Sequence, residues 1–210
     1  MVTIIKHPLI ETKMSILREK STKPKDFRQI LEEIAELMAY EVFKDLEYVE
    51  DGQIETPMKE KAPKYVLKRN IILVPILRAG IGMVEGVQRI VPNAHIGVIG
   101  LTRDEKTLEP MEYYFKVPND LEAECVLIDP MLATGGSAKF AIEALKKRGY
   151  KHIKLMCLVG CDQGIQTIET SHPEVEIYLS AKDPILNEKG YILPGLGDAG
   201  DRIFGTNAND

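Results

Sequence analysis

The sequence predicts an α/β fold: a parallel sheet with helices packed on both faces. Short, largely apolar and partly β-branched runs recur along the chain, and each has the length of a buried strand. Segments with helical spacing or good helix formers lie between them, and strands that alternate with helices build parallel βαβ units. A length of 210 residues suits one sizeable core, so we expect a single domain over residues 1–210.

The composition excludes several classes of protein. With 44% hydrophobic and 28% charged residues, the chain has too many core formers for a disordered protein and too many charges for a membrane protein. The net charge of -5 gives no general attraction to nucleic acid or anionic lipid. Polar residues interrupt the apolar runs near the N-terminus, so we expect no signal peptide or membrane span and predict a cytoplasmic location. Cys125, Cys157 and Cys161 are expected to be reduced core thiols.

The N-terminal part predicts a helix followed by an excursion from the core. Between residues 26 and 46 apolar residues recur at intervals of three and four, which is typical of an amphipathic helix, and Asp26 is the candidate N-cap. Residues 47–70 are largely polar and contain Gly52, Pro57 and Pro63. They are expected to form a loop or a hairpin that projects from the core.

From residue 71 onward, predicted strands and helices alternate. The strands are residues 71–77, 95–101, 125–129, 153–159 and 175–180, and the helices are 81–90, 138–148 and 165–170. Residues 102–124 make too long a segment for a simple connection and are expected to be a lid or a binding loop. The tail from residue 207 is expected to fray.

Candidate functional residues follow the predicted strands, where open α/β sheets bind their ligands. Arg78 comes after the first of the strands from residue 71 onward, Arg103 after the second, and residues 129–137 after the third. Each of these groups can bind phosphate, through a guanidinium or through backbone N–H groups. We therefore expect a phosphorylated ligand at this edge of the sheet.

Residues 129–137 have the outline of a phosphate-binding loop. Glycines and hydroxyls from Thr134 to Ser137 lie where the next helix begins, and unpaired N–H groups and the helix dipole favour an anion there. Asp129 could accept hydrogen bonds from the vicinal hydroxyls of a ribose whose 5-phosphate lies in the loop. The alternative is a tight turn with Ser137 as N-cap. The triphosphate-binding pattern GxxxxGK[ST] is absent from the sequence.

The stretch after Arg78 allows more than one interpretation. Gly80, Gly82 and Gly86 give flexible backbone beside an arginine, which suits a diphosphate, so we expect these glycines to contact pyrophosphate. One alternative is a surface salt bridge for Arg78. Another is a dinucleotide-binding fingerprint, but the spacing G-x-G-x-x-x-G departs from that pattern.

Two further segments are candidates for ligand contact. The charged segment 101–118 contains Arg103 and Lys106 and could close over a reactive intermediate, although solvated charge is the simpler interpretation. The glycine-rich segment 190–206 exposes backbone that suits a flat polar ligand approached edge-on, and the alternative is an irregular turn packed on the sheet. The sequence contains no calcium-loop pattern, no histidine pair at metal spacing and no G-x-S-x-G nucleophile pattern.

Together these motifs resemble a known family. VLIDPMLATGGS, which ends at Ser137, resembles the phosphoribosyl-pyrophosphate loop of the type I phosphoribosyltransferases in the form found in uracil phosphoribosyltransferases. VPILRAGIGM, RDEKTLEP and GYILPGLGDAGDRIFGT are similar to other signatures of that family, and the similarity extends from Lys6 to Thr206. The resemblance implies a Rossmann-like parallel-sheet core with N-terminal helices and a small projecting loop or hairpin. It also implies a pyrimidine-salvage reaction that depends on Mg²⁺ and converts uracil and phosphoribosyl pyrophosphate to UMP and pyrophosphate.

The resemblance also assigns site residues. Arg78, Arg103 and Asp198 would be catalytic, with both arginines on the pyrophosphate side of the donor. The donor would be bound by these three and by Asp129, Pro130, Met131, Leu132, Ala133, Thr134, Gly135, Gly136 and Ser137. Uracil would be bound by Ile192, Gly197, Asp198 and Ala199. Since a proline follows Asp129, the paired acids of the wider superfamily are absent, and Mg²⁺ is expected on the donor's own oxygens rather than at a metal site of the protein.

Other functions stay open on the sequence alone. A regulator with the same fold could bind a nucleotide or RNA without turnover, but the acidic chain and its full set of motifs disfavour it. A dinucleotide-dependent oxidoreductase would need a proper glycine fingerprint. From the resemblance we also expect a homodimer or a higher homo-oligomer, GTP as a candidate activator, and neither nucleic acid nor membrane as a partner.

Overall fold

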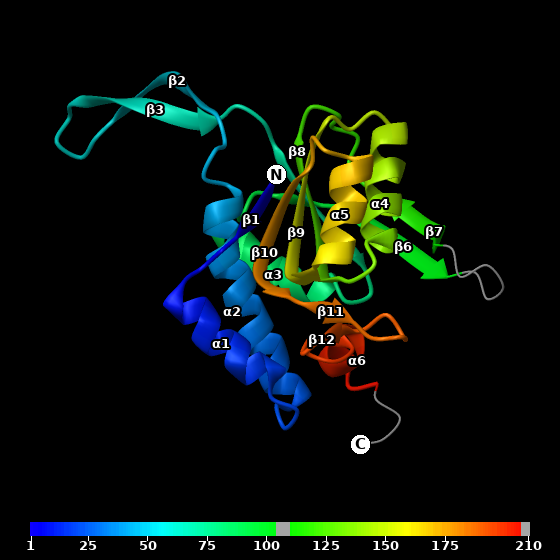
Figure 1. Cartoon of the computed structure of the whole chain (residues 1–210). Helices are drawn as coiled ribbons and strands as arrows, with labels where there is room; N and C mark the ends of the chain where they lie inside the picture. Colours follow the sequence, from blue (N-terminus) through cyan, green and yellow to red (C-terminus); the bar gives the residue numbers. More distant parts are fainter. Residues whose placement is uncertain (104–109, 207–210) are drawn as a thin grey trace.

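A largely parallel sheet forms the centre of the computed structural model, which describes residues 1–103 and 110–206 and only the backbone of residues 103 and 110. Its strands are β1 (Val2–Ile4), β4 (Ile71–Leu77), β5 (His95–Ile96), β6 (Val98–Arg103), β7 (Pro110–Lys116), β8 (Glu124–Leu132), β9 (His152–Cys161) and β10 (Glu176–Asp183). They follow the order β1–β10–β9–β8–β4–β6–β7, with β5 also paired to β4 (Figure 1). Only β7 is antiparallel to its neighbour, β6.

The direction in which the chain builds the sheet reverses between β4 and β8. Residues 71–75 of β4 pair with residues 124–128 of β8, while β6 lies on the other side of β4 and β9 on the other side of β8. In open α/β sheets the ligand site lies at such a reversal, beyond the carboxyl ends of the strands. Since β4 ends just before Arg78 and β8 runs through Asp129, the topology brings these two residues to one edge.

Helices cover both faces of the sheet. The helices α1 (Pro8–Arg18), α2 (Pro24–Val42) and α3 (Ile81–Ile90) share one core with the sheet, and α4 (Gly136–Lys147) and α5 (Asp162–Ser171) share the other. Successive strand residues point to opposite faces, so Leu73 of β4 lies in the first core while Ile72 and Val74 lie in the second. The predicted α/β architecture is therefore confirmed (Figure 1).

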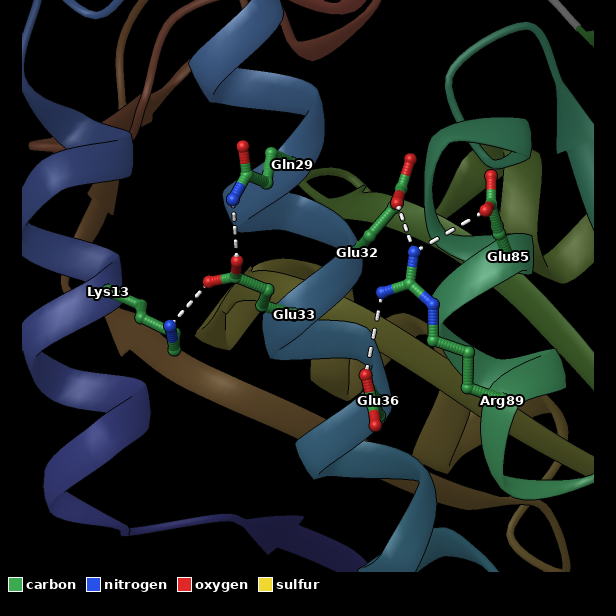
Figure 2. Close-up of polar contacts among 7 residues, drawn as sticks. All are labelled: Lys13, Gln29, Glu32, Glu33, Glu36, Glu85 and Arg89. Atoms are coloured by element: carbon green, nitrogen blue, oxygen red, sulfur yellow. Dashed lines mark hydrogen bonds and ion pairs between the residues drawn. The ribbon is translucent and has the colours of Figure 1, made fainter.

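A polar network joins the outer sides of α1, α2 and α3. Figure 2 shows its members, which are Lys13, Gln29, Glu32, Glu33, Glu36, Glu85 and Arg89. Arg89 reaches three of the glutamates, and its shortest contact is the 2.8 Å hydrogen bond from Nη2 to Glu32. Lys13 pairs with Glu33 and links α1 to α2. Exposed ion pairs of this kind contribute little stability individually, so the cores carry most of the packing energy.

A two-stranded hairpin extends away from the rest of the molecule (Figure 1). Its strands, β2 (Tyr48–Glu55) and β3 (Lys61–Leu67), are antiparallel and form a separate sheet. Several of its large apolar side chains are exposed: Tyr48, Val49, Ile54, Met58, Tyr65, Val66 and Leu67. The predicted loop or hairpin at residues 47–70 is thus a hairpin, and its apolar surface is typical of a contact surface between proteins.

The C-terminal residues 185–206 pack against the C-terminal end of α1 and the N-terminal part of α2. They contain the short strands β11 (Ile185–Leu186) and β12 (Ile192–Leu193), which pair with each other, and the helix α6 (Ala199–Phe204). Arg28 of α2 donates a hydrogen bond of 2.8 Å to the carbonyl oxygen of Ile203. Ile203 itself is buried in the core that α1, α2 and α3 share.

The predicted elements from residue 71 onward are all present, but several ends differ. Strand 71–77 and helix 81–90 have the predicted bounds, whereas strand 125–129 continues to Leu132 and strand 95–101 is divided between β5 and β6. Asp26 is not the N-cap of α2, because the helix already begins at Pro24, whose fixed φ suits the first helical position. The same helix ends at Val42 rather than at residue 46.

The segment 102–124 is only partly the loop that was predicted. Residues 110–116 form β7, which pairs with β6 and extends the sheet. Lys106 lies outside the described residues, as does the tail from residue 207. The helix α1 agrees with the N-terminal helices that the resemblance implies, although the hydrophobic pattern does not mark it because polar residues interrupt the apolar runs. The edge strand β1 is not predicted, because it spans only three residues.

Gly80, Gly82 and Gly86 are packing positions in the fold, and their expected contact with pyrophosphate stays a prediction. A Cβ added at Gly80 would lie 2.4 Å from the carbonyl oxygen of Ile128 in β8. One added at Gly82 would lie 2.9 Å from side-chain carbons of Leu31 and Ile203, and one at Gly86 would lie 2.0 Å from the carbonyl oxygen of Glu32. These glycines therefore let α3 approach α2, α6 and the sheet closely.

The three cysteines are buried and unpaired, as predicted. Burial raises the pKa of Cys125 to about 12 and also raises the pKa of Cys157, so both thiols stay protonated near neutral pH. No helix in the described part of the chain is long and apolar enough to cross a membrane.

The close approach of α2 and α3 gives a stability prediction. Gly86→Ala should lower the free energy of unfolding by more than about 2 kcal/mol, since the new methyl group meets rigid backbone. Gly52→Ala serves as the control: an added Cβ meets nothing within 4 Å, and only the left-handed backbone at φ 78° opposes it. It should cost about 1 kcal/mol. Urea unfolding measures both variants, and equal losses would contradict the packing role of Gly86.

Candidate functional site

The loop between β8 and α4 turns sharply at Gly135. This residue has φ +83° and is the N-cap of α4, a backbone conformation that glycine adopts without strain. The alternative with Ser137 as N-cap is therefore wrong, because Ser137 already lies inside the helix. The 12-residue helix α4 begins just beyond the carboxyl end of β8, so the positive end of its dipole lies at that edge of the sheet. The N–H of Gly136 donates a 3.4 Å hydrogen bond to Thr134 Oγ1.

Helix α5 supports this loop from behind. Thr167 Oγ1 donates a 2.8 Å hydrogen bond to the carbonyl oxygen of Thr134, and Cys161 Sγ lies 3.1 Å from the carbonyl oxygen of Ala133. Gly164 permits the close approach, because a Cβ there would lie 2.5 Å from the carbonyl oxygen of Ala133. Since N–H and C=O of a planar trans peptide point in opposite directions, the N–H groups of Thr134 and Gly135 point away from α5.

Asp129 lies beside the loop at the carboxyl end of the sheet. Its Oδ1 accepts a 3.4 Å hydrogen bond from the backbone N–H of Met131. Burial raises the pKa of this carboxyl to about 7, and the Met131 hydrogen bond opposes the shift without cancelling it. Near neutral pH the side chain therefore exists in both protonation states, and it can accept or donate a hydrogen bond to a hydroxyl group.

Arg78 lies where β4, β8 and α6 meet. Its guanidinium Nη2 is 3.5 Å from Asp201 Oδ1 and its side chain is 58% exposed, so the guanidinium is open to a ligand. Asp198 caps α6 by accepting a 2.9 Å hydrogen bond from the N–H of Asp201. A Cβ added at Gly200 would lie 3.3 Å from Asp198 Oδ1 and 3.8 Å from Arg78 Nη2, so both groups lie close to Gly200.

Arg103 is the last residue of β6, the strand next to β4. Its backbone therefore lies at the same end of the sheet as Arg78, but its side chain lies outside the described part of the structure. The same holds for Lys106, including its backbone. The backbone of Arg103 therefore lies near the reversal between β4 and β8, which we call the switch point, and no contact is assigned to its side chain.

The predicted uracil positions surround the start of α6. Gly197, with φ +81°, and Asp198 are exposed, whereas Ile192 and Ala199 are 2% and 3% exposed. Ile192 packs its side chain into the core, so only its backbone could serve a ligand. The same restriction applies to Leu132 in the predicted donor loop, which is 1% exposed and belongs to the other core.

The structure therefore brings together most of the predicted residues and adds some that sequence reasoning missed. Arg78, Asp129, the loop at Gly135 and Asp198 share one edge of the sheet. Asp201, which pairs with Arg78, follows Asp198 closely in the motif GDAGD and could have been included from that spacing. Gly164 and Thr167 support the loop from a distant part of the chain, and no local pattern marks them.

The fold is one that solved phosphoribosyltransferases also have. A solved hypoxanthine-guanine phosphoribosyltransferase from Bacillus anthracis has the same fold, with a TM-score of 0.52 at 13% identity over 76% of this chain and 80% of that one. The AQ2163 protein from Aquifex aeolicus is much more similar, with a TM-score of 0.93 at 36% identity over 99% of this chain and 100% of that one.

The particular family follows from the sequence comparisons. The family model for uracil phosphoribosyltransferase matches residues 4–206. A uracil phosphoribosyltransferase from Geobacillus kaustophilus is 52% identical over 98% of both chains. One from Lactobacillus delbrueckii subsp. bulgaricus is 54% identical over 97% of this chain and 98% of that protein. The chain belongs to the uracil phosphoribosyltransferase family.

The raised pKa of Asp129 predicts how stability depends on pH in the ligand-free protein. The folded-state pKa of about 7 exceeds the ordinary aspartate pKa of 3.8, so the folded state binds more protons between these pH values. The contribution of Asp129 to stability therefore falls as the pH rises through that window. Asp129→Asn removes this loss, so the variant should gain stability relative to wild type as the pH rises from about 4 to about 7.

Thermal unfolding across this pH range measures the effect. Asp51→Asn, on the exposed hairpin, is the control and should follow the wild-type curve at constant offset. If Asp129→Asn also followed the wild-type curve at constant offset, the buried carboxyl would not titrate as described.

Proposed function

We propose that the protein transfers the 5-phosphoribosyl group of phosphoribosyl pyrophosphate to N1 of uracil, giving UMP and pyrophosphate. The observation that carries this proposal is the juxtaposition at the switch point. Arg78 at the end of β4 lies beside a loop on β8 that ends in a helix N-terminus, in a chain of the uracil phosphoribosyltransferase family. The guanidinium of Arg78, the carboxyl group of Asp129 and the N-terminus of α4 thus lie at one edge of the sheet.

The donor is divided among these groups by its chemistry. The loop from Ala133 to Ser137 and the N-terminus of α4 receive the 5-phosphate, because backbone N–H groups and the helix dipole favour an anion. Asp129 binds the ribose hydroxyls next to that phosphate. Arg78 and Arg103 bind the pyrophosphate, and Asp198 lies beside Arg78 on the same side.

Catalysis follows from charge and position rather than from a covalent intermediate. Breaking the bond between C1 and pyrophosphate leaves an oxocarbenium-like sugar and an anionic leaving group. In the proposal, Arg78 and Arg103 stabilise that departing charge, and the loop holds the ribose in line with uracil. The ion pair with Asp201 orients the guanidinium of Arg78 before the donor binds.

The glycine-rich C-terminal segment reads the base. Uracil presents an acceptor, a donor and an acceptor along one edge, and backbone N–H, C=O and N–H groups can match that order. Gly197 and Asp198 are the exposed members of the predicted set, next to Arg78. Cytosine would set its amino group against a backbone donor and leave both unpaired, which is the stronger form of discrimination.

Magnesium belongs to the proposal as a partner of the donor. Within residues 1–103 and 110–206, no three His, Cys, Asp or Glu side chains are grouped so that they could hold a metal ion. We therefore assign Mg²⁺ to the donor's own oxygens, where it would neutralise part of the pyrophosphate charge. The roles given to the protein residues above do not depend on it.

The assembly and its setting are further parts of the proposal. The exposed apolar side chains of the β2–β3 hairpin support a homodimer or a higher homo-oligomer. Unpaired, buried cysteines support a reducing compartment such as the cytoplasm. GTP remains a candidate activator on family resemblance.

The reaction is tested by incubating the protein with phosphoribosyl pyrophosphate, Mg²⁺ and one of three bases. Uracil should give UMP, whereas kcat/KM for cytosine should be lower by at least about a thousandfold, and orotate should be rejected as well. Chromatography of the products measures all three. Absence of UMP would favour a regulator without turnover, and comparable turnover of cytosine would contradict recognition of the base edge.

The role of Arg103 is tested separately. Arg103→Ala should lower kcat about a hundredfold or more, because the developing charge on pyrophosphate loses a cation in the transition state. Arg69→Ala, near the base of the hairpin where Arg69 pairs with Glu47, is the matched control and should keep kcat. An unchanged kcat in Arg103→Ala with only a higher KM for the donor would contradict the catalytic role.

A further inference from the structure

The glycine-rich segment 190–206, called the base-reading segment below, is bound by an ion pair whose two residues lie outside the family motifs. Arg18, the last residue of α1, forms a two-pronged ion pair with Asp183, the last residue of β10. Arg18 Nη1 lies 2.7 Å from Asp183 Oδ2, and Nη2 lies 2.7 Å from Oδ1. Asp183 is 5% exposed, so this pair is mostly shielded from water.

Both partners of the pair also bind the backbone of Gly195. Arg18 Nη1 donates a 2.7 Å hydrogen bond to the carbonyl oxygen of Gly195, and Asp183 Oδ2 accepts a 2.9 Å hydrogen bond from its N–H. The peptide groups on either side of Gly195 are therefore fixed by one closed ring of contacts. Gly195 itself has φ +60°, and a Cβ there would lie 2.0 Å from the carbonyl oxygen of Ile192.

A second arginine fixes the next residue. Arg202 of α6 donates hydrogen bonds of 2.8 Å to the carbonyl oxygen of Leu196 and 2.6 Å to that of Leu17. Arg202 Nη2 donates a hydrogen bond to the carbonyl oxygen of Glu19, whereas the other two bonds come from Nη1. The guanidinium lies 4.4 Å from the centre of the Phe27 ring. Two consecutive carbonyl groups of the segment are thus bound to the end of α1.

Such anchoring matters because the segment has little order of its own. Gly190, Gly195 and Gly197 all have positive φ, and the only strand pairing nearby is the short ladder of β11 with β12. A glycine-rich segment loses much conformational entropy when it becomes ordered on a ligand. A contact that orders the segment before the ligand arrives removes that cost from binding.

We propose that the Arg18–Asp183 pair positions the backbone around Gly195 in the base-reading segment, and so sets affinity and selectivity for the base far more than affinity for the donor. The proposal rests on the proposed function. It makes Arg18 and Asp183 positioning residues, because neither has a place in the predicted donor or base contacts. The donor groups Arg78 and the loop at Gly135 are held by other contacts, to Asp201 and to α5.

The test compares Arg18→Met with wild type in steady-state kinetics. The variant should raise KM for uracil about tenfold and narrow the uracil-to-cytosine ratio of kcat/KM, since a charged hydrogen-bonded contact is lost. KM for phosphoribosyl pyrophosphate should change less than about twofold, because the donor site keeps its own supports. Arg18→Lys keeps the positive charge but loses the two-pronged geometry of the guanidinium. Its KM for uracil should therefore lie between those of wild type and Arg18→Met.

Lys13→Met is the matched control. Lys13 lies on the same helix and pairs with Glu33 of α2, away from the base-reading segment (Figure 2). Lys13→Met should keep the wild-type KM for uracil and the wild-type KM for phosphoribosyl pyrophosphate. If Arg18→Met fails to fold with Asp183 left unpaired, the double variant Arg18→Met/Asp183→Asn removes both charges and should show the same split between the two KM values.

Amide hydrogen exchange separates failure of this inference from failure of the proposed function. In Arg18→Met the amide of Gly195 should exchange faster, while the amides of the loop around Gly135 should keep their wild-type rates. An unchanged Gly195 amide, or equal increases in both KM values in a folded variant, would overturn the positioning role. Wild-type protein that forms no UMP would overturn the proposed function, whatever the exchange rates show.

Discussion

The parallel pairing of β4 with β8 is the constraint on which the site depends. Because these strands run in the same direction, the chain leaves both of them at one edge of the sheet, and it then turns away to opposite sides. The segments that follow therefore diverge to opposite faces of the sheet, and Arg78 and Asp129 lie where they part. Both strands are buried between two helical layers, which fixes their register. The residues at their carboxyl ends therefore start from a rigid backbone.

The two backbone segments proposed to bind ligand are ordered by the same physical device. In the loop before α4, Cys161 at the end of β9 contacts the carbonyl oxygen of Ala133, and Thr167 of α5 donates to that of Thr134. In the C-terminal segment, carbonyl oxygens of Gly195 and Leu196 are bound by arginines. A peptide whose carbonyl group is fixed also has its N–H group fixed, so both segments can present donors with little reorganisation.

The acidic balance of the chain is compatible with a polyanionic donor because charge acts locally at the site. Arg78 is exposed next to a strand end, and the helix dipole of α4 adds a positive end nearby. Burial raises the pKa of Asp129, which reduces the negative charge beside the phosphate near neutral pH. A net charge of -5 spread over the surface has little effect across a screening length of about 8 Å.

The sequence by itself determined the alternation of strands and helices, since hydrophobic periodicity and glycine positions are local signals. It thereby placed Arg78, Asp129 and Gly135 at strand ends, and the topology confirmed that they share an edge. Only the tertiary structure decided that Gly80, Gly82 and Gly86 are packing positions, because a glycine that contacts a ligand and one that admits a neighbouring helix leave the same mark in a sequence. Arg18, Asp183 and Thr167 were equally invisible, since each acts on a partner far along the chain. Local patterns report on neighbours in sequence, whereas support of a site comes from whichever elements the fold packs behind it.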